Sequence, residues 1–174
     1  MKSKKIIAWT IIIVGVFGLL WFTGKSKISN SQNEPIQIEN QSINVGQKLV
    51  APETFYDFGT ISMKNGKASK IFKVRNETNT DILVPNLSTS CMCTVAYVVE
   101  SDGSKKGPFG MPGHGGAVSK VNELIKAGES RDIEVVYDPN AHGPAGVGRI
   151  DRFVYLEDEN GNKLQFEIKA NVTP

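Results

Sequence analysis

The 174-residue chain has little cysteine and histidine, two of each, and all four lie in its second half. Two cysteines are too few for the disulfide framework of a small secreted scaffold. No cysteine precedes Cys91, so the N-terminal region has no lipoprotein attachment site. The spacing of His114 and His142 follows no zinc-finger pattern, which disfavours a structural zinc site built from the four residues.

Charge is missing from one long stretch near the N-terminus. Ile6–Phe22 is 17 residues without a charged side chain, with lysines before and after it. A helix of this length spans roughly 25 Å at about 1.5 Å per residue, which is near the lower limit for crossing a bilayer. The run is longer than the apolar region of a cleaved signal peptide, and no convincing small-x-small cleavage site follows it. We therefore predict a membrane anchor over residues 1–24.

The leading lysines place the N-terminus of this anchor in the cytoplasm and the rest of the chain outside. Residues 25–48 are polar, rich in Asn, Gln and Ser, and without aromatic residues, which is typical of a flexible stalk. We expect one extracytoplasmic domain over residues 49–174.

A basic patch is also missing. Five of the 20 basic residues lie before residue 28, which leaves 15 basic against 18 acidic side chains, a net charge of about −3, in the rest. A nucleic-acid surface needs clustered Lys and Arg to neutralise phosphates. We therefore expect no nucleic-acid partner.

The remaining sequence is dominated by short runs rich in β-branched and aromatic residues. Leu164, Phe166 and Ile168 alternate strictly with polar residues, as in a half-buried strand, and "ENGN" at 159–162 is typical of a hairpin turn. This pattern predicts an all-β fold, an antiparallel β-sandwich of about seven strands. The predicted strands are 54–61, 67–78, 81–87, 93–100, 130–139, 148–159 and 163–172.

One segment does not fit a minimal sandwich. Residues 101–129 begin with a Gly-Pro-rich loop and contain "SKVNELI", which we interpret as at most a short helix. Loops of this length are usually functional or disordered.

The motifs "FYDFGTI", "FKVRNET", "STSCMCT", "AGESRDIEVVYDP" and "EIKANVTP" together resemble the bacterial DUF1573 family over about residues 50–174. The resemblance implies an immunoglobulin-like β-sandwich that is exported and often membrane-anchored, and it brings no established activity. The chain departs from the family pattern at Ala127, where proline is common, at Met92, and in the loops "GPFGMPGHGG" and "HGPAGVG".

The pair Cys91 and Cys93 has three interpretations. In a strand their α-carbons lie about 6.5–7 Å apart, so a disulfide needs a bend there. Two thiolates on one face suit Cu(I), with Met111 or His114 as a third ligand. Free cysteines are also among the most buried residue types, so both side chains can simply fill the core.

Catalysis is disfavoured, although a Cys93–His114 dyad is geometrically conceivable. We interpret Asp57 and Gly59 as structural residues and His142 as a local hydrogen-bonding group. The sequence therefore predicts a non-enzymatic binding or scaffolding module of the bacterial envelope that requires no cofactor and binds an envelope protein. The alternative is a copper-handling domain that uses Cys91, Cys93, Met111 and His114.

Overall fold

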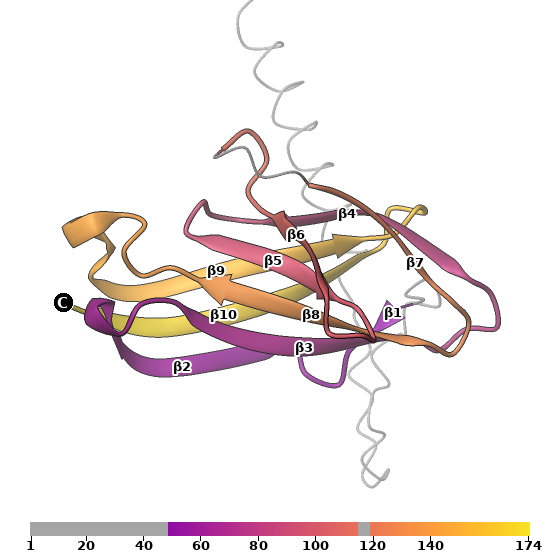
Figure 1. Cartoon of the computed structure of the whole chain (residues 1–174), viewed down its shortest axis with the longest axis horizontal. Coiled ribbons are helices and arrows are strands. Elements are labelled where there is room, and N and C mark those ends of the chain that lie inside the picture. Colours follow the sequence, from indigo (N-terminus) through magenta and orange to yellow (C-terminus); the bar gives the residue numbers. More distant parts are fainter. Residues whose placement is uncertain (1–48, 115–118) are drawn as a thin grey trace, which may run out of the picture. The chain divides into compact units, whose positions relative to one another are not determined.

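The structure is a computed structural model that describes residues 49–114 and 119–174 (Figure 1). Within these ranges the chain is all-β, with ten strands, two short 3-10 helices and no α-helix. The strands are β1 (Leu49–Val50), β2 (Phe55–Ser62), β3 (Ala68–Asn76), β4 (Ile82–Thr89), β5 (Thr94–Val99), β6 (Lys105–Phe109), β7 (Lys120–Ile125), β8 (Ser130–Tyr137), β9 (Gly148–Glu157) and β10 (Lys163–Thr173). The 3-10 helices are η1 (Met63–Asn65) and η2 (Gly143–Gly146).

The predicted anchor (1–24) and stalk (25–48) lie outside the described residues. In the part that is described, no helix has the length and apolar character needed to span a membrane.

The strands form two five-stranded sheets that pack face to face. Sheet A has the order β1-β3-β8-β5-β6, and sheet B has the order β2-β10-β9-β4-β7. Phe72 of β3 stacks on Phe166 of β10, with ring centroids 4.7 Å apart, so the two inner faces meet in one apolar core. Sheet B is mixed rather than purely antiparallel, because β10 pairs with β2 in parallel.

The strand predictions are confirmed where side chains alternate clearly. Each of the seven predicted runs overlaps one strand, with ends that differ by at most two residues, and Phe166 and Ile168 of β10 are buried as the alternation requires. The turn at 159–162 joins β9 to β10, and the Asp158 carboxylate accepts hydrogen bonds from the backbone N–H groups of Asn160 and Asn162. Three strands were not predicted: β1, β6 and β7.

The segment 101–129 contains β6 and β7 where we expected a loop and a short helix. Strand β6 pairs with β5, and β7 pairs with β4, each across one register shift. Gly107 has a φ of 138°, and a Cβ there would lie 3.0 Å from the Ala96 carbonyl oxygen. Only glycine fits this close approach of two backbones without displacing one of them.

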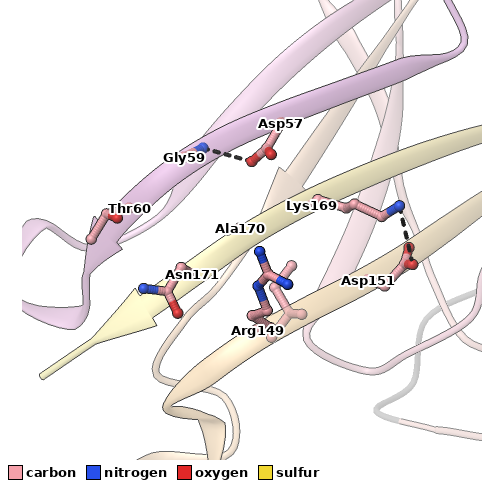
Figure 2. Close-up of a pocket in the computed structure, with 9 residues that line it drawn as sticks. Asp57, Gly59, Thr60, Arg149, Asp151, Lys169, Ala170 and Asn171 are labelled. Atoms are coloured by element: carbon pink, nitrogen blue, oxygen red, sulfur yellow. Dashed lines mark hydrogen bonds and ion pairs between the residues drawn. The ribbon is translucent and has the colours of Figure 1, made fainter.

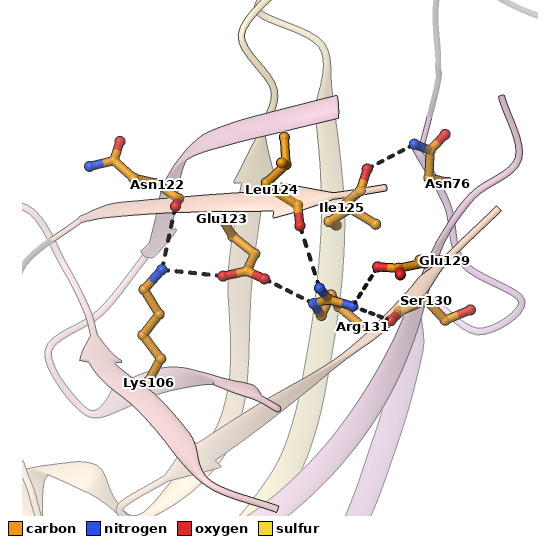
Figure 3. Close-up of polar contacts among 9 residues, drawn as sticks. All are labelled: Asn76, Lys106, Asn122, Glu123, Leu124, Ile125, Glu129, Ser130 and Arg131. Atoms are coloured by element: carbon orange, nitrogen blue, oxygen red, sulfur yellow. Dashed lines mark hydrogen bonds and ion pairs between the residues drawn. The ribbon is translucent and has the colours of Figure 1, made fainter. Parts of the chain in front are cut away.

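Buried polar contacts join the two sheets at the β7 edge (Figure 3). The Glu123 carboxylate of β7, 7% exposed, lies 2.9 Å from Arg131 Nε of β8 and 3.2 Å from Lys106 Nζ of β6. Asn76 of β3 is fully buried, and its Nδ2 donates to the carbonyls of Ile125 and Thr80. These bonds satisfy backbone and charged groups that burial would otherwise leave unpaired.

Candidate thiol site

Cys91 and Cys93 lie in the tight turn between β4 and β5, not inside a strand. The Thr94 N–H donates to the Cys91 carbonyl at 3.1 Å, and the buried Thr89 hydroxyl donates to the carbonyls of Cys91 and Thr94. Ser90 holds the turn against β9, because its N–H donates to the Phe153 carbonyl and its Oγ accepts from the Phe153 N–H. The turn bends the backbone where an extended strand would hold the two cysteines apart.

The connection from β8 to β9 lies beside this turn. Its first residue, Asp138, donates its N–H to the Cys93 carbonyl at 2.8 Å, and the Asp138 carboxylate accepts from the Asn140 N–H at 2.9 Å. The following residues lead through the exposed His142 into η2. Both connections pass from one sheet to the other at the same end of the sandwich (Figure 1).

These two connections bring two thiols and an imidazole together. The Sγ atoms of Cys91 and Cys93 are 2.7 Å apart, and Cys91 Sγ is 3.2 Å from His142 Nε2. The ligand atoms of the three residues all lie within 4.8 Å of one another, and both cysteines are free thiols. Cys93 is buried, Cys91 is half-buried and His142 is exposed, so the group opens to solvent on the imidazole side.

A guanidinium completes the site. Arg152 of β9 donates from Nε to Cys93 Sγ at 3.2 Å and from Nη1 to the Asp151 carbonyl at 2.8 Å. Burial would lower the pKa of Arg152, but the hydrogen bond and charge of Cys93, together with the charges of Cys91 and Tyr137, raise it. The guanidinium therefore stays positive beside the thiols.

The two thiols differ in acidity. Burial would raise the pKa of Cys91, but hydrogen bonds from the Cys93 thiol, the Cys93 N–H and His142, with the charge of Arg152, lower it from 9.0 to about 7. Burial and the hydrogen bond to Cys91 raise the pKa of Cys93. Cys91 is thus the thiol that ionises first, and Cys93 holds the shared proton.

The structure places the predicted site residues only partly together. Cys91 and Cys93 meet, whereas Met111 and His114 lie in the turn after β6, and His114 is not a member of the thiol–imidazole group. We had interpreted His142 as a local hydrogen-bonding group, and its partner is the Cys91 thiol. The sequence analysis did not predict Arg152 as a site residue, because it lies in no recognisable motif. It reaches Cys93 only because segments far apart in the sequence meet in the fold.

Asp57 and Gly59 have the structural roles predicted for them. The Asp57 carboxylate accepts from the Gly59 N–H at 2.8 Å, and Gly59 has a φ of 68°. Both residues line an open hollow of about 820 Å³ between β2, β10 and β9 (Figure 2). Arg149, Lys169 and Asp151 also line it, and the two latter form an ion pair. The thiol site is not part of this hollow.

A known family model matches the first part of the domain. Residues 49–107 match the DUF1573 family model. This model describes a protein of unknown function, and its match confirms the resemblance seen in the sequence. The DUF1573 match includes both cysteines and ends before His142 and Arg152. No curated protein matches the chain.

One solved structure supports the fold alone. A protein of unknown function from Porphyromonas gingivalis W83 is 14% identical with a TM-score of 0.51, and the match covers 71% of this chain and 46% of that one. The secreted serine protease VesC from Vibrio cholerae (13% identity, TM-score 0.44, covering 72% and 24%) and the YadV chaperone (11%, 0.40, covering 73% and 53%) are more distant. The chain thus spans about half or less of the length of these proteins.

Proposed function

We propose that the domain is a non-enzymatic, immunoglobulin-like binding module of the bacterial envelope, and that it binds Cu(I) through Cys91, Cys93 and His142. The observation that carries the proposal is the meeting of two free thiols and one imidazole within 4.8 Å. Thiolates are soft ligands that select Cu(I), and imidazole also suits copper. A metal between the thiols requires the sulfur atoms to move apart from 2.7 Å to about 4 Å, which side-chain rotation in a turn allows.

A nucleophilic role for Cys91 has weaker support, although His142 lies within hydrogen-bond reach of it. An activated thiol needs a base that is oriented by a third group. Among the described residues the His142 ring forms no hydrogen bond besides the one with Cys91, and His142 is exposed in a surface connection. The free thiol of Cys93 next to Cys91 instead supplies the second sulfur ligand that a chelating pair needs.

The location belongs to the same proposal. The uncharged run Ile6–Phe22 and its flanking lysines support a single anchor with a cytoplasmic N-terminus and an extracytoplasmic domain. Soft-metal sites are useful in that compartment only if the thiols stay reduced, since an oxidising environment favours disulfides. The proposal therefore also requires that Cys91 and Cys93 are reduced in place.

The test is an anaerobic Cu(I) titration of the full-length chain in detergent against a chromophoric chelator, with intact mass to verify both thiols. We expect one Cu(I) per chain, binding lost in Cys91→Ser and Cys93→Ser, and affinity lowered about tenfold or more in His142→Ala. His114→Ala is the matched control, because it removes the only other histidine of the chain. No stoichiometric binding by the reduced protein would refute the copper proposal.

A protein partner is the second candidate function. β1 pairs with only two residues of the nine-residue β3, so most of that sheet edge has no partner strand in the described structure. Ile71 on β3 is 51% exposed. An open edge can accept an added strand from an envelope protein. Crosslinking of the anchored protein in cells should then yield a product that Ile71→Lys loses and that the cysteine variants keep.

A further inference from the structure

Arg152 is a half-buried cation that contacts a sulfur atom of the thiol pair rather than a carboxylate. Its side chain contacts Cys93 Sγ and the Asp151 carbonyl, and it forms no ion pair with a carboxylate within residues 49–114 and 119–174. Arginine that leaves water usually has a paired anion, because an unpaired buried charge is costly. Here the thiol pair takes that place.

We propose that Arg152 makes the site selective for the monovalent ion Cu(I) over divalent ions such as Zn(II). This inference rests on the proposed copper function. Two thiolates and a neutral imidazole around Cu(I) carry a net charge of −1, whereas the same ligands around Zn(II) carry none. The Arg152 guanidinium, which lies 3.2 Å from Cys93 Sγ in the metal-free site, attracts the first complex and has no net charge to pair with in the second.

The ratio of the two affinities isolates this effect. Both metals bind the same metal-free site, so the charge and protonation of that site cancel when the two dissociation constants are compared. What remains is the difference between the two loaded complexes, where Arg152 pairs with a net charge in only one of them. Arg152 is thus a specificity-determining residue that need not touch the metal.

The experiment measures the dissociation constants for Cu(I) and for Zn(II) on the full-length reduced chain in detergent. We expect Arg152→Gln to lower the preference for Cu(I) over Zn(II) by at least about tenfold, which corresponds to about 1.4 kcal/mol. Arg152→Lys should keep most of the preference, since it retains the charge without the planar fork. Arg149→Gln removes an exposed cation from the same strand and should leave the ratio unchanged.

The outcomes separate the two proposals. If Cu(I) binds through the cysteines but the ratio is the same in Arg152→Gln and wild type, the role of Arg152 is overturned and the copper site stands. If the wild type binds no Cu(I), both proposals fail. Thermal unfolding of each variant shows whether it is folded, and Arg152→Lys provides the comparison if Arg152→Gln is not.

Discussion

Removal of the Glu123 carboxylate should destabilise the domain more than removal of any exposed acid. Glu123 is 7% exposed, and its carboxylate accepts hydrogen bonds from Arg131 Nε at 2.9 Å and Lys106 Nζ at 3.2 Å. Both donors come from strands of the opposite sheet. A hydrogen bond to a charged group contributes about 1.5–3 kcal/mol when it is buried, and a solvent-screened pair about 0–1 kcal/mol.

The exposure of Arg131 and Lys106 determines how much free energy of unfolding the substitution of Glu123 should cost. The Arg131 side chain is 21% exposed, so its bond to Glu123 counts nearly in full, whereas Lys106 is 41% exposed and can turn to water. Arg131 keeps Glu129 and the Ser130 carbonyl after the change. We therefore expect Glu123→Ala to lower the free energy of unfolding by about 2–3 kcal/mol, or the melting temperature by about 5–10 °C.

An exposed ion pair provides a control that separates the effect of burial on stability from the effect of the distance between the charges. Asp132 lies 2.6 Å from Lys73 Nζ, closer than either partner of Glu123, but the two side chains are 35% and 59% exposed. Asp132→Ala should therefore cost less than about 1 kcal/mol. Urea denaturation of the full-length chain, followed by circular dichroism, measures both variants. Equal losses for Glu123→Ala and Asp132→Ala would refute the reasoning from burial.

Four further predictions concern the thiol site and two other parts of the domain. Because the pKa of Cys91 is lowered to about 7, about half of it is thiolate at pH 7, against about 1% for a thiol with a pKa of 9.0; alkylation of the metal-free protein should follow a midpoint near pH 7. Between about pH 7 and pH 9 the same shift should make the folded state more stable as the pH rises, in urea denaturation under reducing conditions, whereas above pH 9 the raised pKa of Cys93 acts in the opposite direction. Gly107→Ala should lower the melting temperature, because its Cβ would lie 3.0 Å from a backbone oxygen of β5, whereas Gly103→Ala, with the same sign of φ but nothing within 4 Å, should lower it less. Asn76→Ala should cost about 1–3 kcal/mol by removing the buried Nδ2 donor of the Ile125 carbonyl, and Asn76→Asp should not rescue it, since a carboxylate cannot donate to that carbonyl.

The sequence allowed the strands to be predicted where side chains alternate, but not β7. In "KVNELI" the inward positions are Val121, Glu123 and Ile125, so a charged residue interrupts the apolar alternation. Glu123 can face inward only because its counter-ions come from β6 and β8. Pairing of this kind depends on tertiary contacts, which periodicity within one segment does not contain.

The site was predictable in part for a similar reason. Cys91 and Cys93 stand out because they are the only cysteines. The glycine-rich loop with Met111 and His114 was the nearest source of further ligands in sequence, but sheet topology puts the β8–β9 connection beside the β4–β5 turn. His142 and Arg152 follow from strand order, and no local pattern gives that order.

The division of the site between two connections affects how the family name can be used. Cys91 and His142 are 51 positions apart, and the family match at 49–107 contains the former without the latter. A protein can therefore match over the same segment and have the thiols but no imidazole or guanidinium beside them. Transfer of any activity among such proteins needs a check, chain by chain, of the β8–β9 connection and of β9 itself.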